Sequence, residues 1–171
     1  TGSTFSWSTP MTVELILMFL DVLARLHATF WENDDIADPL LGICTTQQLL
    51  DQTALPVASK HQDFPTSPIP GWVCRGWDVL PELLAPEVLT KLHNLVENPQ
   101  PLHAALQRYP CTLLHGDYRI DNLAYHHGCP VLLDWQESTY SVMTIDLAWL
   151  VKQSYVQNVM SRAQATSFYR S

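Results

Sequence analysis

The chain has 171 residues, and 9 Lys and Arg against 17 Asp and Glu give it a formal charge of −8. Because 47% of the residues are hydrophobic and only 15% are charged, the chain can bury the core of one ordinary domain, which excludes wholesale disorder. The acidic balance argues against a nucleic-acid partner bound through its phosphate backbone, since such binding needs a basic face.

Four cysteines occur without a Cys-x-x-Cys pair, so the sequence offers neither a zinc ribbon nor a thioredoxin motif. They are Cys44, Cys74, Cys111 and Cys129. An apolar chain of this length has little need of disulfide bonds. Reduced thiols and a cytoplasmic location are therefore expected.

The first expected element is a helix over residues 9–31. Thr9 followed by Pro10 is typical of an N-cap and a first helical position. Apolar residues then recur every three or four positions, which predicts one buried helix face. These residues are Leu15, Phe19, Val22, Leu26 and Phe30. Charged residues interrupt the same stretch, so no membrane span is expected, and the stretch lacks the basic start and cleavage site of a signal peptide.

The middle of the chain, residues 56–86, is expected to be irregular because it contains six prolines. Two of its tryptophans, Trp72 and Trp77, each follow a glycine, and packing anchors are favoured over ligand stacking for them. A helix is predicted from about Pro86 to Glu97, and a short one follows over residues 101–108.

Short strands are expected from Cys111 onwards. Residues 111–114 form an apolar run of strand length, and two further runs lie at 123–125 and 131–133. The turn-like segment between the latter two predicts a β-hairpin. A helix is then expected from about Thr144, and helical structure continues over residues 144–171 without a stop signal, which indicates a truncated end.

Four residues of this region form a pattern that suits phosphoryl transfer. Asp117 is expected on a loop between two strands, where its carboxylate can accept a proton from a substrate hydroxyl. Asn122 and Asp134 offer the kind of oxygen ligands that Mg²⁺ prefers. Arg119 can reach a transferred phosphoryl group as a fixed cation. A base, a cation and two metal ligands are the parts that such a site requires.

The pattern resembles that of the aminoglycoside phosphotransferase and choline kinase-like superfamily, which are small-molecule kinases with a protein-kinase-like fold. Three segments carry the resemblance in order: His115-Gly116-Asp117-Tyr118-Arg119-Ile120-Asp121-Asn122, Leu132-Leu133-Asp134-Trp135-Gln136 and Asp146-Leu147-Ala148. The Asp-Trp-Gln variant, with an upstream Leu23-Ala24-Arg25-Leu26-His27, looks most like the ecdysteroid-kinase-like bacterial phosphotransferases. The resemblance covers most of the chain, though only loosely between Asn33 and Pro110.

The resemblance implies an α+β fold, the mainly helical large (C-terminal) lobe of a protein-kinase-like enzyme. Residues 111–136 would form its catalytic loop and metal-binding β-hairpin. Asp117 would be the catalytic base, with Arg119 in the place of the catalytic-loop Lys of protein kinases. Asn122 and Asp134 would bind Mg²⁺ and, through it, ATP.

Two further residues gain a role from the resemblance. His115 would be a structural member of the loop, and Asp146 a buried carboxylate that braces the loop backbone from the following helix. For each, a plainer reading stays open: a half-buried histidine with satisfied hydrogen bonds, and an acid favoured at a helix N-terminus.

Kinases of this fold also need a small lobe with a phosphate-covering loop and a Lys that pairs with ATP. The chain has six glycines in no such cluster, and its lysines at 60, 91 and 152 all follow the first helix. The small ATP lobe is therefore expected to be absent from residues 1–171 and to lie N-terminally in a longer chain. The isolated chain would then have little or no activity.

Other functions stay open beside that of an ATP-dependent O-phosphotransferase. One is a non-catalytic kinase-like module that binds a ligand or partner, and a weaker one is a hydrolase or metal-binding module. The hydroxyl substrate, a small molecule expected against residues 56–86 and the later helices, stays open among amine-bearing antibiotics, choline-like cations, sugars and steroids.

Overall fold

The computed structural model describes the whole chain except residues 1, 6–9, 53, 64 and 128. The chain divides into two compact units, and the length had suggested one domain. Unit 1 combines Thr1–Cys44 with Tyr109–Ser171, and unit 2 is the intervening segment Thr45–Arg108. Unit 1 is thus assembled from both ends of the sequence.

The first helix, α1, spans Val13–Thr29, and the hydroxyl of its N-cap Thr12 accepts a hydrogen bond from Leu15 N–H at 3.3 Å. The predicted start at Pro10 is therefore wrong, and Thr9 lies outside the described residues. The residues of α1 that face the core are mostly three or four positions apart. All but Phe19 lie one position after a residue of the predicted face. The core-facing residues are Ile16, Phe19, Leu20, Leu23 and His27.

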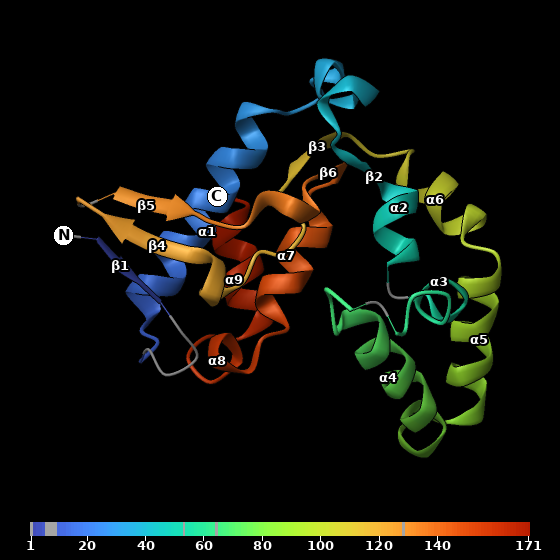
Figure 1. Ribbon diagram of the computed structural model, residues 1–171. Helices are drawn as coiled ribbons and strands as arrows, with labels where there is room; N and C mark the ends of the chain where they lie inside the picture. Colours follow the sequence, from blue (N-terminus) through green and yellow to red (C-terminus); the bar gives the residue numbers. More distant parts are fainter. Residues whose placement is uncertain (1, 6–9, 53, 64, 128) are drawn as a thin grey trace. The chain divides into compact units, whose positions relative to one another are not determined.

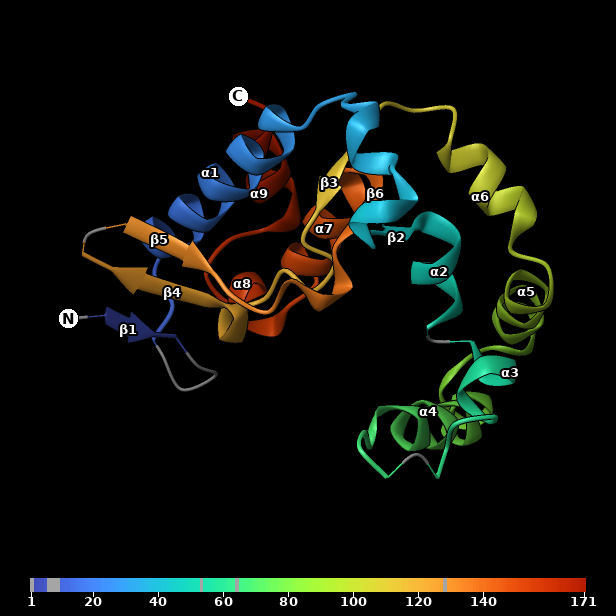
Figure 2. The same cartoon turned by 45° about the horizontal axis from the view of Figure 1, so that its top comes forward.

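Two small sheets build the β part of unit 1 (Figures 1 and 2). In the first, β1 (Gly2–Thr4) pairs antiparallel with β4 (Leu123–His126), which pairs antiparallel with β5 (Cys129–Leu132). The β4–β5 pair is the predicted hairpin. In the second sheet, β6 (Thr139–Val142) lies between β2 (Cys44–Thr45) and β3 (Cys111–Leu114), and Leu114 stands opposite Thr139.

The C-terminal part of unit 1 is three short helices rather than one continuous stretch. They are α7 (Thr144–Val151), α8 (Ser154–Gln157) and α9 (Arg162–Tyr169). A capping box at Ser161 and Gln164 starts α9. In Figure 2 α9 lies beside α1, and the two share one core with α7, in which Leu20, Leu150 and Ala165 are at most 1% exposed.

Unit 2 is helical, and the expectation of an irregular segment over 56–86 is wrong. Its helices are α2 (Thr46–Asp51), α3 (Leu55–Ala58), α4 (Ile69–Leu83), α5 (Pro86–Glu97) and α6 (Gln100–Leu106). Half of its prolines lie in the first turn of a helix, where a missing N–H costs nothing, as Pro70 and Pro86 show. Pro81 lies inside α4, near its end.

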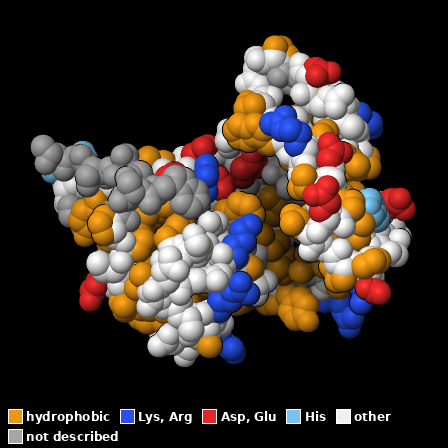
Figure 3. All heavy atoms as spheres, turned by 90° about the horizontal axis from the view of Figure 1, so that it is seen from below, with side chains coloured by type: hydrophobic (Ala, Val, Ile, Leu, Met, Phe, Trp, Pro, Cys, Tyr) orange, Lys and Arg blue, Asp and Glu red, His pale blue; other side chains and the backbone are white. Residues whose placement is uncertain are grey.

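Unit 2 buries little of its apolar surface. Its described residues with less than a tenth of their surface exposed are Thr46, Ala54 and Ala58. Trp72 is 58% exposed and Leu83 72%, while Trp77 lies beside His93 and lines a cavity of about 120 Å³. Figure 3 shows hydrophobic side chains among charged ones on the surface of the molecule. Unit 1 therefore holds the substantial core, and with it the predicted site.

The whole is an α+β fold with small sheets, as expected. In the described part of the chain, no helix is both long and apolar enough to cross a bilayer.

Candidate active site

The site is built on the loop that leaves β3 and enters β4. After Leu114 the chain makes a turn through His115, Gly116 and Asp117, and a short 3₁₀ helix over Ile120–Asn122 then leads into β4. Pairing of β3 with β6 fixes where the loop begins, and pairing of β4 with β5 fixes where it ends.

Asp146, in the first turn of α7, holds the backbone of this loop. Its carboxylate is fully buried and accepts hydrogen bonds from His115 N–H at 2.7 Å and from Gly116 N–H at 2.9 Å. Bonds from backbone N–H groups to a buried carboxylate are among the stronger ones in proteins. The loop therefore cannot shift without breaking charge-assisted hydrogen bonds.

Two residues from the ends of unit 1 stand behind that carboxylate. His27 of α1 places Nε2 at 3.4 Å from Asp146 Oδ2 and Nδ1 at 2.6 Å from the hydroxyl of Tyr169 in α9. A neutral imidazole satisfies both contacts when the tyrosine donates to Nδ1 and Nε2–H donates to the carboxylate. Burial, aided by the charge of Asp146, raises the pKa of Tyr169 to about 12, so its hydroxyl keeps that proton.

Gly116 is required by the shape of the loop. Its φ is +86°, a conformation that side chains disfavour, and a Cβ there would overlap the backbone carbonyl of Glu137. Only glycine lets the loop pass this close to the segment between β5 and β6.

His115 ties the loop to the end of the hairpin. Its ring is fully buried, its Nε2 lies 2.8 Å from the carbonyl oxygen of Leu133, and its Nδ1 lies 3.3 Å from the amide of Asp117. A carbonyl can only accept and an amide N–H only donates, so the two contacts fit the tautomer that carries its hydrogen on Nε2. The ring also packs against Trp135, with centroids 4.8 Å apart.

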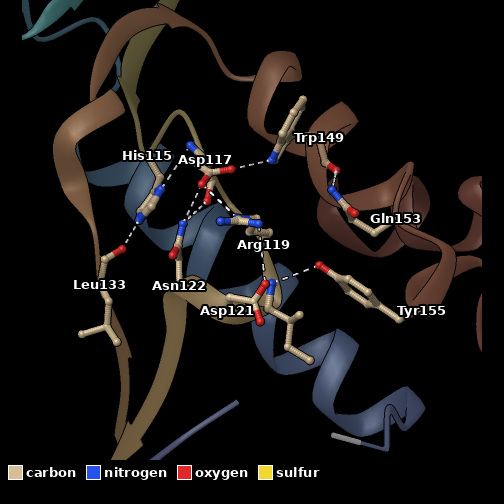
Figure 4. Close-up of polar contacts among 10 residues, drawn as sticks. His115, Asp117, Arg119, Asp121, Asn122, Leu133, Trp149, Gln153 and Tyr155 are labelled. Atoms are coloured by element: carbon tan, nitrogen blue, oxygen red, sulfur yellow. Dashed lines mark hydrogen bonds and ion pairs between the residues drawn. The ribbon is translucent and has the colours of Figure 1, made fainter. Parts of the chain in front are cut away.

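The carboxylate of Asp117 is held from three sides (Figure 4). Its Oδ2 accepts hydrogen bonds from Arg119 Nε and from Asn122 Nδ2, both at 2.9 Å, and its Oδ1 accepts one from the indole N–H of Trp149 at 3.0 Å. Asn122 Nδ2 also donates to the backbone carbonyl of Asp117 at 2.9 Å. Arg119 extends towards a second carboxylate as well, with Nη1 3.6 Å from Asp121 Oδ2.

Two tyrosines anchor the rest of the loop. The side chain of Tyr118 is fully buried, and its hydroxyl donates to the carbonyl of Phe19 at 2.7 Å. Burial raises the pKa of Tyr118 well above its ordinary value, which keeps the donated proton in place. The hydroxyl of Tyr155 accepts from Ile120 N–H at 3.0 Å (Figure 4).

Sequence reasoning missed Trp149 and Lys152. Trp149 is the residue directly after the matched Asp146-Leu147-Ala148 segment, and one helical turn separates it from Asp146. The helical spacing from Asp146 was therefore the available signal. Lys152 follows three residues later and places its ammonium over the indole ring, 3.1 Å from the ring centroid.

Comparison with known proteins identifies the family. Residues 12–169 match the phosphotransferase enzyme family, APH. The chain belongs to this family. No significant match was found among curated proteins or among solved structures. Membership of this family makes phosphoryl transfer the general activity.

Family membership confirms the predicted superfamily, while the ecdysteroid-kinase-like branch stays a prediction. Of the six predicted site residues, the structure brings Asp117, Arg119 and Asn122 into direct contact. His115 and Asp146 contact the same loop through the bonds given above.

Asp134, the remaining predicted residue, follows Leu133, whose N–H donates to the backbone carbonyl of Asn122 at 2.9 Å. Asp134 is exposed and has a left-handed backbone, with φ of 61° and ψ of 68°. The backbone pairing brings the two predicted metal ligands to adjacent positions at the end of the hairpin.

The donor set at this position fits Mg²⁺. The amide nitrogen of Asn122 is committed to Asp117, so its oxygen is the atom left to coordinate a cation. An amide oxygen and an exposed carboxylate suit a hard cation that keeps several waters and phosphate oxygens as further ligands. Within the described residues, no cluster of three or more His, Cys, Asp or Glu forms a metal site of another kind.

Proposed function

We propose that this chain carries the catalytic centre of an ATP-dependent small-molecule kinase, which transfers a phosphoryl group to a substrate hydroxyl. The observation that carries the proposal is the Asp117 carboxylate, held by three N–H donors on a loop that a buried carboxylate fixes in place. Because Asp117 lies at the partly exposed tip of the loop, these hydrogen bonds orient its carboxylate as a base and do not stabilise a buried core.

In this mechanism Asp117 accepts the proton of the substrate hydroxyl. Its Oδ2 takes two of the donors, whereas Oδ1 accepts the indole N–H of Trp149 and has a second lone pair. Oδ1 is therefore the oxygen that receives the hydroxyl proton, and the donors fix its direction. Positioning of this kind supplies much of the rate enhancement in phosphoryl transfer.

Asn122 and Asp134 would hold Mg²⁺ with the phosphates of ATP, which would neutralise the charge that develops on the transferred group. Arg119 stands beside the base and is itself held by Asp117 and Asp121, so its guanidinium is oriented before a substrate arrives. We also place the enzyme in the cytoplasm, because an apolar chain of this length has little need of disulfide bonds. Within the superfamily, Asp134-Trp135-Gln136 favours the ecdysteroid-kinase-like branch.

The test compares Asp117→Asn with Asp134→Ala in the full-length gene product that contains these residues. Transfer from MgATP to an acceptor panel and binding of a fluorescent ATP analogue with Mg²⁺ are both measured. Asp117→Asn removes the base but leaves the metal ligands, so transfer should fall about 10³-fold while nucleotide affinity stays near that of the wild type. Asp134→Ala should lose both.

Asp21→Asn is the matched control, because Asp21 is an exposed carboxylate on α1 whose partner is Arg25. It should change neither measurement. Equal loss of nucleotide affinity in both site variants would contradict the separate roles of base and metal ligand. Nucleotide or ligand binding without any transfer by the wild type would favour the alternative, a non-catalytic binding module.

A further inference from the structure

The two site residues that the sequence did not reveal form one unit at the end of α7. The edge of the Trp149 indole donates its N–H to Asp117 Oδ1, and the face of the same indole carries the Lys152 ammonium, 3.1 Å from the ring centroid. Gln153 donates from its side chain to the backbone carbonyl of Trp149 at 3.1 Å (Figure 4). One aromatic ring thus connects a positive charge to the proposed base.

Lys152 and Arg119 differ in how many carboxylates lie close to their charged groups. Arg119 lies within 4 Å of two carboxylates, those of Asp117 and Asp121. Among the residues that the structure describes, no carboxylate lies that close to Lys152. Its side chain is exposed, yet partial loss of hydration lowers its pKa, while the charge of Asp117 acts in the opposite direction. Lys152 is therefore the cation of the site that can take an anionic partner.

The position of the ammonium also bears on cationic substrates. A tryptophan face beside a catalytic carboxylate would attract a substrate ammonium through a cation–π contact. Here Lys152 already occupies that face. A substrate amine would have to displace it or lie beside a like charge, and either is unfavourable.

We propose that Lys152 binds a negatively charged group of the acceptor substrate, so that the enzyme phosphorylates hydroxyl compounds bearing a phosphate or carboxylate in preference to amino alcohols. The inference rests on the proposed function, because it takes Asp117 as the base that faces the acceptor. Phosphate and carboxylate share the relevant chemistry, which is an anionic oxygen that an ammonium can contact.

The first test measures binding without catalysis. Three compounds of one skeleton are titrated into the protein: glycerol 3-phosphate, glycerol and 3-amino-1,2-propanediol. The readout is the indole N–H signal of Trp149 in ¹⁵N–¹H NMR spectra, assigned by its disappearance in Trp149→Phe. Glycerol 3-phosphate should move this signal, and its Kd should rise about tenfold in Lys152→Met, because one charge-assisted contact is lost.

Two variants control for the change in net charge. Lys152→Arg keeps a cation at the site and should bind glycerol 3-phosphate nearly as the wild type does. Lys91→Met removes an exposed lysine of α5 in unit 2 and should leave the Kd unchanged. The inference is overturned if glycerol 3-phosphate leaves the Trp149 signal in place, if Lys152→Met binds it like the wild type, or if the amine binds more tightly.

The second test separates the acceptor from the phosphoryl group in transfer, which is also anionic. The kcat/KM for MgATP-dependent transfer is measured with each of the three compounds. If Lys152 binds the anionic group of the acceptor, Lys152→Met should lower kcat/KM for glycerol 3-phosphate much more than kcat/KM for glycerol. An equal fall for both acceptors would assign Lys152 to the transferred group and overturn the inference.

The outcomes also distinguish failure of this inference from failure of the proposed function. If the tenfold effect on Kd holds but no compound of the acceptor panel is phosphorylated, the anion-binding site is supported and the kinase function is contradicted. If transfer occurs with a clear preference for the amine, the kinase function is supported and the inference is contradicted.

Discussion

Asp146→Ala should be the most destabilising single substitution at the site. The carboxylate is fully buried and accepts bonds of 2.7 and 2.9 Å from two backbone N–H groups, with His27 as a further neighbour at 3.4 Å. A hydrogen bond to a charged group contributes about 1.5–3 kcal/mol. Losing two would cost about 3–6 kcal/mol, and removing a buried charge offsets part of this. A net loss of about 3 kcal/mol is expected.

The measurement is the free energy of unfolding in urea, followed by circular dichroism, with hydrogen exchange of the peptide that contains His115 and Gly116. A loss of about 3 kcal/mol corresponds to a fall in Tm of roughly 6–12 °C for a chain of this size. Asp21→Ala, at an exposed ion pair, should cost less than about 1 kcal/mol. The reasoning would be refuted if both substitutions cost the same and the loop amides exchanged at the wild-type rate.

Three further predictions concern the same unit. Gly116→Ala should lower the free energy of unfolding by about 2 kcal/mol or more, since the new Cβ both overlaps a backbone carbonyl and requires a positive φ; a urea curve like that of the wild type would contradict this. Trp149→Phe should lower kcat about tenfold with little change in the KM for ATP, because it removes one donor from Asp117 and retains an aromatic side chain; a change confined to KM would exclude the positioning role. Burial raises the pKa of Cys111, which leaves less thiolate at pH 8, so iodoacetamide followed by peptide mass spectrometry should find the exposed Cys129 alkylated first; faster labelling of Cys111 would contradict its burial.

The sequence predicts the loop and hairpin well because their signals are local. Asp117 and Asn122 lie within one short segment, and the two strands of the hairpin are neighbours in the chain. The residue types in such a segment are determined by the backbone conformation of the segment itself. Gly116, with its positive φ, is an example.

The elements that were missed depend on contacts between distant residues or on an ambiguous pattern. In α1 every position from Val13 to Leu20 except Glu14 is apolar, so spacing alone could not select the buried face. β6 was missed because its partner β3 lies far earlier in the chain. The prolines between residues 56 and 86 predict irregular structure, whereas Pro56 and Pro70 occupy the first turns of α3 and α4.

The contacts that run from Tyr169 through His27 to Asp146 have a consequence for how this loop forms. The carboxylate that fixes the loop contacts His27 of α1, and His27 in turn contacts Tyr169 of α9, so local sequence alone cannot complete the arrangement. During synthesis, His115 and Asp117 leave the ribosome well before Tyr169 does. Contacts between such distant residues form late, since closing a long loop costs chain entropy first. The geometry of this loop is therefore expected to be among the last parts of unit 1 to form, once α9 has packed.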